Sequence, residues 1–246
     1  MRVTVLGGSG AWPTAAEPCS GFLLRHEGFS LLLDVGYAVL PRLLDVMPAE
    51  RLDAVYVSHG HPDHCADLNP LLRARAFSAA EPPPLPVYAP RGALDAVLAL
   101  DRPGMLDAAL EHRDFEPGAG FAVGAFELRT TSLPHWEPNA AVRVAAGGRA
   151  VVYTGDGGPH PALVELARSA DVLVAEATYP EHMTVENAPY LCTARQAARQ
   201  AAQAGVGRLV LTHLWPGTEP GDHLAAAAKE YDGPTCVATS GLSFDV

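Results

Sequence analysis

Short apolar runs, each bounded by glycine, proline or polar residues, recur along the whole chain and predict β-strands. These runs lie at 2–6, 21–26, 29–34, 55–57, 86–89, within 115–133, and at 140–146, 149–154, 172–175, 208–212 and 235–237. Longer segments with apolar residues on one face predict helices at 37–47, 64–76, 91–100, 105–111, 159–170, 193–204 and 221–231. Strands therefore occur in both halves of the chain with helices between them, which predicts an α/β or α+β fold.

Composition narrows the class of protein. The 246 residues suit one large domain or two small ones. Hydrophobic residues make up 48% and charged residues 18%, which favours a compact globular chain. We find no run of about 20 apolar residues, so we expect no membrane span. The four cysteines have no paired spacing and the chain begins as a strand without a signal-peptide layout, so we expect a cytoplasmic protein with reduced thiols.

The candidate chemistry is concentrated directly after the apolar run 55–57. Three histidines and one aspartate follow within six residues: His59, His61, Asp63 and His64. Gly60 and Pro62 lie between them and predict a tight turn, so the four side chains should project from one loop at a strand end. Imidazole and carboxylate groups are the ligands of catalytic zinc sites. A single histidine would favour an ordinary packed residue, whereas four ligand types this close together predict a metal site.

The spacing H-x-H-x-D-H resembles the metallo-β-lactamase superfamily, and the rest of the chain supplies matching positions. The matches are Pro134-His135-Trp136, Tyr153-Thr154-Gly155-Asp156-Gly157-Gly158 and Leu211-Thr212-His213-Leu214. Two further stretches resemble the ribonuclease Z-like branch: the opening Leu6-Gly7-Gly8-Ser9-Gly10-Ala11-Trp12-Pro13, and Ala175-Glu176-Ala177-Thr178. Trp12 could line the pocket of such an enzyme or simply pack, and its sequence position fits both.

The resemblance implies both a fold and a site. The fold is a single domain over 1–246, an α+β protein in which an αββα sandwich of two mixed β-sheets carries helices outside. The site holds two zinc ions, with Mn²⁺ or Fe²⁺ as alternatives. The implied ligands are His59, His61 and His135 for one metal, Asp63, His64 and His213 for the other, and Asp156 as the bridge. The implied nucleophile is a metal-bridging hydroxide. The first two ligands of the motif, His59 and His61, are both histidines, which favours zinc over redox iron.

Two positions depart from the resembled enzymes. Ribonuclease Z enzymes pair a glutamate with histidines that protonate the leaving group, and here those positions are Ala175 and Leu191. Glu176 is retained, and we predict Asp63 and Glu176 as the catalytic residues, although Glu176 could equally brace the site. Asp34, in an Asp-Val-Gly turn, is expected to orient the metal loop through hydrogen bonds. Between His135 and Asp156 there is room only for a hairpin, where transfer-RNA enzymes carry a long arm.

Charge and these departures define the expected reaction. The net charge is −11 and the sequence has no basic run, so we expect no broad nucleic-acid surface. The prediction is a hydrolase of a small-molecule substrate, with a small phosphodiester favoured. An ester, lactone or thioester hydrolase, and a metal-binding protein without turnover, are the alternatives. Transfer-RNA processing is not expected, and a homodimer is left open.

Overall fold

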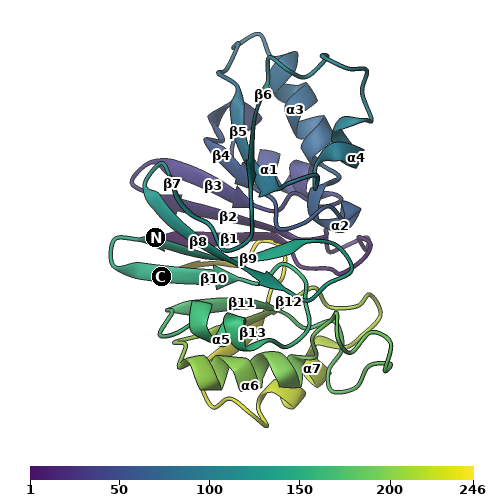
Figure 1. Cartoon of the computed structure of the whole chain (residues 1–246), viewed down its shortest axis with the longest axis vertical. Coiled ribbons are helices and arrows are strands. Elements are labelled where there is room, and N and C mark those ends of the chain that lie inside the picture. Colours follow the sequence, from purple (N-terminus) through teal and green to yellow (C-terminus); the bar gives the residue numbers. More distant parts are fainter.

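The computed structural model describes residues 1–246, and its centre is a pair of stacked β-sheets (Figure 1). The first sheet has the strand order β14-β1-β2-β3-β4-β5-β6 and the second has the order β13-β12-β11-β10-β9-β8-β7. The strands of the first sheet are β1 (Arg2–Gly7), β2 (Gly21–His26), β3 (Phe29–Leu33), β4 (Ala54–Tyr56), β5 (Leu85–Pro90), β6 (Leu110–Phe115) and β14 (Ser243–Asp245). The strands of the second are β7 (Gly120–Val123), β8 (Phe126–Leu133), β9 (Asn139–Ala146), β10 (Arg149–Tyr153), β11 (Val172–Glu176), β12 (Leu209–Thr212) and β13 (Thr235–Val237).

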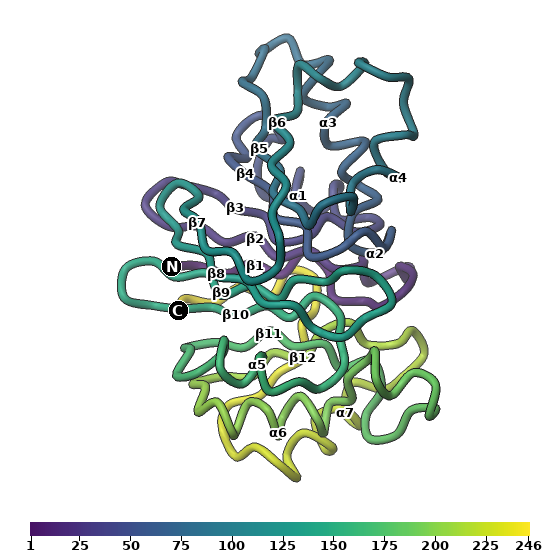
Figure 2. Tube along the Cα trace, in the orientation of Figure 1, coloured from purple at the N-terminus to yellow at the C-terminus, as the bar shows by residue number.

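Both sheets are mixed. In the first, β1 to β3 pair antiparallel and β3 to β6 pair parallel. In the second, β7 to β10 pair antiparallel and β10 to β13 pair parallel. Figure 2 follows the chain from the first sheet into the second, and both termini lie at the same side of the molecule. The predicted sandwich of two mixed sheets is confirmed.

Helices cover the outer face of each sheet (Figure 1). The helices are α1 (Val39–Val46), α2 (Pro62–Cys65), α3 (Leu68–Ala76), α4 (Asp95–Leu98), α5 (Pro161–Leu166), α6 (Ala194–Ala204) and α7 (Pro220–Ala227), with a short 3₁₀ turn η1 (Ala49–Arg51). Strand residues alternate between faces, so Leu31 and Leu33 enter the apolar layer between the sheets while Leu32 packs toward the helices. A separate apolar layer packs α5 to α7 against the second sheet. None of these helices combines the length and apolar character of a membrane span.

Three local predictions are wrong. The helix expected at 105–111 is replaced by a turn and the start of β6, whose polar, largely exposed sequence hides an edge strand paired with β5. The helix expected at 64–76 is broken into α2 and α3 at Asp67. The Asp67 carboxylate accepts a hydrogen bond from the Leu40 amide, which ties this break to the start of α1. The last strand, β14, is too short to be recognised from its sequence pattern.

Candidate metal centre

All seven predicted metal ligands follow the ends of strands that meet at one edge of the sandwich. His59 lies three residues beyond β4, His135 two beyond β8, Asp156 three beyond β10, and His213 directly after β12. The loop after β4 contributes three more ligands because it turns into α2. His61 is the N-cap of α2 with extended backbone angles, and Pro62 fixes the first helical position. Asp63 and His64 in that helical turn therefore follow at once, which explains the dense ligand spacing.

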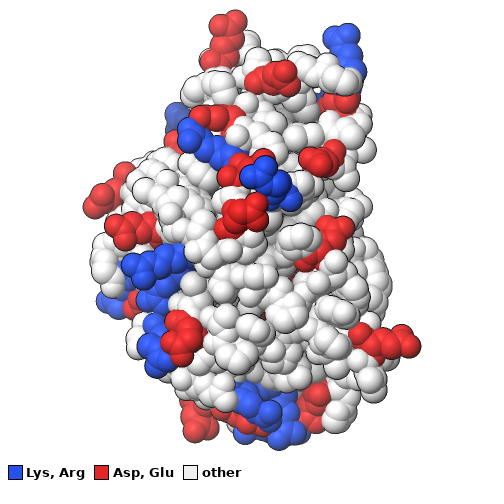
Figure 3. Space-filling model, viewed as in Figure 1, with Lys and Arg blue, Asp and Glu red and all other residues white.

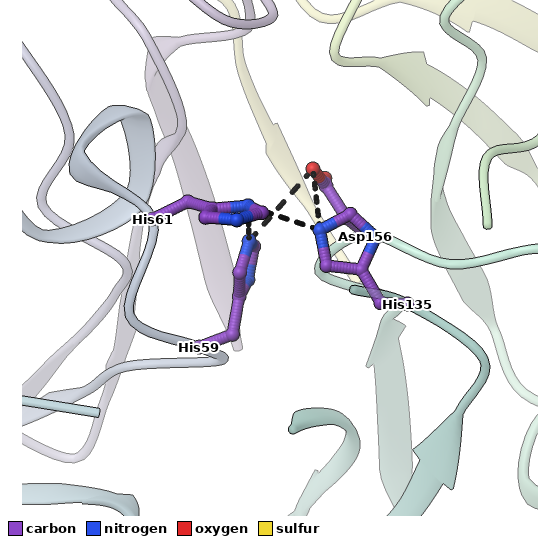
Figure 4. A group of neighbouring side chains, drawn as sticks. All are labelled: His59, His61, His135 and Asp156. Carbon is purple, nitrogen blue, oxygen red and sulfur yellow. Dashed lines mark hydrogen bonds and ion pairs between the residues drawn. The ribbon is translucent and has the colours of Figure 1, made fainter. Parts of the chain in front are cut away.

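The first cluster consists of His59, His61, His135 and Asp156 (Figure 4). The Nδ1 atom of His61 lies 3.1 Å from Nε2 of His59 and 3.0 Å from Nε2 of His135. An Asp156 carboxylate oxygen lies 3.9 Å from each of the latter two nitrogens. A tetrahedral ion with ligands about 2.0–2.1 Å away would hold its ligand atoms roughly 3.3 Å apart. The separations given above lie on both sides of this value, so the four atoms converge closely enough to hold one ion.

The second cluster consists of Asp63, His64, Asp156 and His213, all buried. Nε2 of His213 lies 3.1 Å from Asp63 and 3.2 Å from Asp156. Nε2 of His64 lies 3.2 Å from the other oxygen of Asp156. Asp156 is thus the one residue common to both clusters, with its two oxygens in contact with different histidines.

The buried carboxylate of Asp34 fixes two of these histidines. It accepts a hydrogen bond from Nδ1 of His64 at 2.6 Å and another from the Ser58 hydroxyl at 2.7 Å. Because the Ser58 hydroxyl donates to Asp34, it can accept from Nδ1 of His59, 3.1 Å away. Tyr153 also donates to Asp34, at 2.6 Å. The expected orienting role of Asp34 therefore agrees with its contacts, and both imidazoles are left with Nε2 facing the clusters.

Glu176 holds His213 through a similar relay. The Thr178 hydroxyl donates to Glu176 at 2.6 Å, and it lies 3.0 Å from Nδ1 of His213, from which it can accept. The Glu176 carboxylate also accepts from the Gly157 and Cys192 amides at 2.6 and 3.0 Å. Glu176 has 1% of its surface exposed and three donors on its two oxygens, and these contacts would orient His213. Its catalytic role stays a prediction.

The remaining two histidines have partners of their own. Nδ1 of His135 donates to the Tyr190 carbonyl at 2.9 Å. His61 is the most exposed of the ligand histidines, and its outward Nε2 lies 3.9 Å from the half-exposed Glu137 carboxylate. Four of the five ligand histidines therefore have an oxygen within hydrogen-bond distance on the side away from their cluster, which selects the tautomer that points a lone pair inward, and His61 has only the more distant Glu137 carboxylate.

The buried histidines and carboxylates of the centre shift one another's pKa values. Burial lowers the pKa of His59 and of His135. Burial alone would lower the pKa of His213 as well, but the Asp156 and Asp63 carboxylates raise it to about 9. Burial alone would raise the pKa of Asp156, but His213 and His64 hold it well below its usual value. The carboxylates therefore depend on positive charge in this pocket.

The donor set fits a metal for a second, independent reason. Since Nδ1 of His135 carries its proton toward Tyr190, the Nε2 lone pair of His135 faces Nδ1 of His61. Nε2 of His64 and Oδ1 of Asp156 are fully buried, and neither makes a hydrogen bond. Buried polar atoms without partners are rare and need an explanation. One cation in each cluster would give every one of these atoms a partner.

The glycine-rich loop after β1 closes one side of the second cluster. A Cβ atom at Gly10 would lie 2.8 Å from the ring of His213, so only glycine fits there. The next amide, Ala11, donates to the Asp63 carboxylate at 2.8 Å. Ser9 forms an isolated parallel β-bridge with Leu214, and the Gly10 amide donates a 2.9 Å hydrogen bond to the Leu214 carbonyl. The loop therefore supports two ligands of the second cluster, Asp63 and His213.

The structure brings all seven predicted ligands together in the two predicted groups. Glu176 lies behind the site and not in its opening, and Asp63 lies within the second cluster. Sequence reasoning missed the hydroxyls of Ser58 and Thr178, the Tyr190 carbonyl and the Glu137 carboxylate. Ser58 and Glu137 lie within two residues of a ligand, a signal that could have identified them. The others reach the site only through tertiary structure.

Replacing Asp34 with asparagine is expected to lower metal affinity about 10- to 100-fold. Asparagine tolerates the left-handed backbone of this residue (φ 56), but its amide donates where Ser58, His64 and Tyr153 require an acceptor. Asp171→Asn is the matched control, because Asp171 binds Arg149 and the Ala150 amide at the opposite end of β10. Titration of each protein against a competing chelator measures the change. Equal affinity in wild type and Asp34→Asn would show that Asp34 does not orient the ligands.

Comparison with known proteins adds an independent observation. A family model described as a beta-lactamase superfamily domain matches residues 30–214. The chain is 32% identical to "Probable metallo-hydrolase YhfI" of Bacillus subtilis over the full length of both. The crystal structure of that YhfI covers 99% of each chain with a TM-score of 0.90.

Enzymes named for RNA processing are also similar. "Ribonuclease Z" of Myxococcus xanthus is 28% identical over all of this chain and 98% of its own. The crystal structure of the short form of human tRNase Z covers all of this chain and 99% of its own, with a TM-score of 0.79 and 23% identity. The latter likeness concerns the fold alone.

Proposed function

The chain belongs to the metallo-β-lactamase superfamily as a metallo-hydrolase, and we propose that it hydrolyses a small phosphodiester with two zinc ions held at the paired clusters. One ion would be held by His59, His61 and His135, the other by Asp63, His64 and His213, and both by Asp156. When bound, such ions supply Lewis-acid polarisation of the substrate and water that is acidic enough to attack at neutral pH. Imidazole and carboxylate ligands suit zinc.

The observation that carries the proposal is the shared residue Asp156. In the second cluster its two oxygens lie 3.2 Å from Nε2 of His64 and of His213. In the first cluster one of these oxygens lies 3.9 Å from Nε2 of His59 and of His135. Two metal ions held by the residues of these clusters would stabilise the attacking and leaving oxygens of an in-line displacement at phosphorus. The relatives named ribonuclease Z act on a phosphodiester, RNA, which supports the same bond type here.

The protein's own residues would orient the reactants. Asp34, Ser58, Glu176 and Thr178 fix the tautomers of the ligand histidines, so the inner face of the site is set before substrate binds. His61 has 29% of its side chain exposed, against 0% for His59 and 1% for His135. The substrate would therefore approach past His61 and Glu137.

We propose a small substrate and not a folded RNA. The segment between His135 and Asp156 is a tight hairpin in which β9 and β10 are joined by Gly147 and Gly148. The net charge is −11. On the face in Figure 3, the basic side chains are interspersed with acidic ones, which gives little attraction for a polyanion.

A substrate panel tests the proposal. Zinc-loaded protein is expected to cleave small aryl phosphodiesters faster than lactones, thioesters or β-lactams of similar reactivity, and to leave a transfer-RNA precursor uncut at its 3′ end. Chelated protein is the control and should cleave none of them. Faster turnover of a lactone or thioester would assign the centre to carbonyl chemistry. Specific 3′ trimming of the precursor would overturn the proposal that the substrate is small and not a folded RNA.

A further inference from the structure

All three tryptophans of the chain lie next to the metal centre. Trp12 follows the loop that contacts Asp63 and His213, Trp136 follows His135, and Trp215 lies two residues after His213. Two tyrosines join them in ring contacts. We call these five residues the aromatic rim: Trp12, Trp136, Tyr179, Tyr190 and Trp215.

The part of the rim beside the second cluster is held rigidly. Trp12 and Trp215 pack edge to face with their ring centroids 5.0 Å apart, and Tyr179 lies 5.7 Å from Trp215. The Trp215 amide donates to the Thr178 carbonyl, and the Ser9 hydroxyl donates to the Trp12 carbonyl. Backbone bonds thus tie these rings to the same loops that carry His213 and its partner Thr178.

The other part of the rim lies beside the first cluster. The Trp136 ring lies 5.1 Å from the His135 ring and 5.2 Å from the Tyr190 ring. The Tyr190 carbonyl accepts the hydrogen bond that orients His135. Rings therefore flank both clusters, each within one or two residues of a ligand or of a group that orients one.

These rings remain far more exposed than packing requires. Trp12 is 46% exposed and Trp136 is 52% exposed, while the largest apolar side chains of the core are below 2%. A buried aromatic ring removes about 150–250 Å² from water, so leaving two tryptophans half open forfeits much of that stabilisation. Packing alone would account for Trp215, which is partly covered, but not for the open faces of Trp12 and Trp136.

We propose that the aromatic rim binds a flat aromatic group carried by the substrate, so that the substrate is a phosphodiester with a nucleobase or aryl substituent. This inference rests on the proposed function, because the rim adjoins the centre where the phosphate would bind. An exposed indole face stacks on any planar π-system. Because the Trp136 ring lies 5.1 Å from the His135 ring, a group stacked there would lie beside the phosphate.

Binding of four matched compounds tests the rim separately from the phosphate site. The probes are a purine nucleoside monophosphate, ribose 5-phosphate, the nucleoside and ribose, each titrated by calorimetry into zinc-loaded protein. The nucleotide is expected to bind about 5- to 100-fold more tightly than ribose 5-phosphate. Since every tryptophan belongs to the rim, quenching of tryptophan fluorescence by the nucleoside reports on this surface directly. Phenyl phosphate distinguishes a general aryl site from a nucleobase site.

Variants identify the residues responsible. Trp12→Leu and Trp136→Leu are expected to reduce the ratio of nucleotide affinity to ribose 5-phosphate affinity. The corresponding phenylalanine variants are expected to keep most of this ratio. Phe77→Leu is the control, because Phe77 is 66% exposed and packs on Arg73 of α3. If the nucleotide and ribose 5-phosphate bind equally tightly, the aromatic rim does not bind an aromatic group, and the phosphodiester proposal is unaffected. Binding of the nucleoside but not of ribose 5-phosphate would support the rim and reject a phosphate substrate.

Discussion

The variant Asp156→Ala is expected to lose more than about 100-fold of its phosphodiester hydrolysis. Substitutions of groups that only orient ligands already cost about 10- to 100-fold, and Asp156 is the one side chain common to both clusters. Its loss also removes a carboxylate oxygen that lies 3.2 Å from Nε2 of His64 and another that lies 3.2 Å from Nε2 of His213. Initial rates on an aryl phosphodiester, at saturating zinc, measure the effect.

His135→Ala is the matched control, because it removes a ligand of the first cluster only. It is expected to bind one metal fewer than wild type, whereas Asp156→Ala should weaken both sites. Asp171→Ala, at the other end of β10, should keep full activity. Asp156→Ala with a rate near that of wild type would show that the clusters do not act as a pair.

The second large effect concerns the leaving group. Aryl phosphodiesters are expected to be cleaved about 10²–10⁴-fold faster than alkyl ones, because general acid catalysis contributes about that much and the alkyl leaving group needs it most. The two positions where the resembled enzymes carry proton-donating histidines are Ala175 and Leu191, both buried. The Glu176 carboxylate already accepts hydrogen bonds from three groups, the Gly157 and Cys192 amides and the Thr178 hydroxyl. A series of substituted phenyl and alkyl diesters measures the slope of rate against leaving-group pKa.

Glu176→Gln separates positioning from proton transfer in the same series. Since Glu176 acts through Thr178 on His213, the substitution should change aryl and alkyl rates by the same factor and leave their ratio unchanged. A selective loss of alkyl cleavage would identify Glu176 as a proton donor. A flat profile in wild type would indicate another donor, and Glu137, 3.9 Å from His61, would be the first residue to replace. His182 is less suitable, because its side chain is 92% exposed and lies beside Glu181.

The sequence predicted the ligands in two ways. The density of ligand-type residues identified the loop His59–His64, whereas the assignment of His135, Asp156 and His213 came from the family resemblance, and each of these three lies within three residues of a strand end. The loop His59–His64 is the clearest case, since a short turn forces neighbouring residues into one site. The role of Glu176 could not be predicted in the same way. Its partners Gly157, Thr178 and Cys192 come from separate loops, and only the fold shows that they occupy both carboxylate oxygens.

The secondary structure was predictable to a similar degree. Near-continuous apolar runs identify the inner strands of both sheets, because burial on both faces leaves few polar positions. Strand β6 was missed because only one face of an edge strand needs to be apolar, and Glu111 to Asp114 hide it. The exposure of Trp12 likewise depends on tertiary contacts, and its sequence position was compatible with packing or with lining a pocket.

The central claim is that one chain holds two metal ions joined by Asp156, and elemental analysis of purified protein tests it most directly. Protein prepared without chelator, and protein reconstituted with zinc, should each contain close to two ions per chain. Asp156→Ala prepared alongside should contain fewer than one. A wild-type value near zero after reconstitution, or equal metal content in wild type and Asp156→Ala, would contradict the assignment.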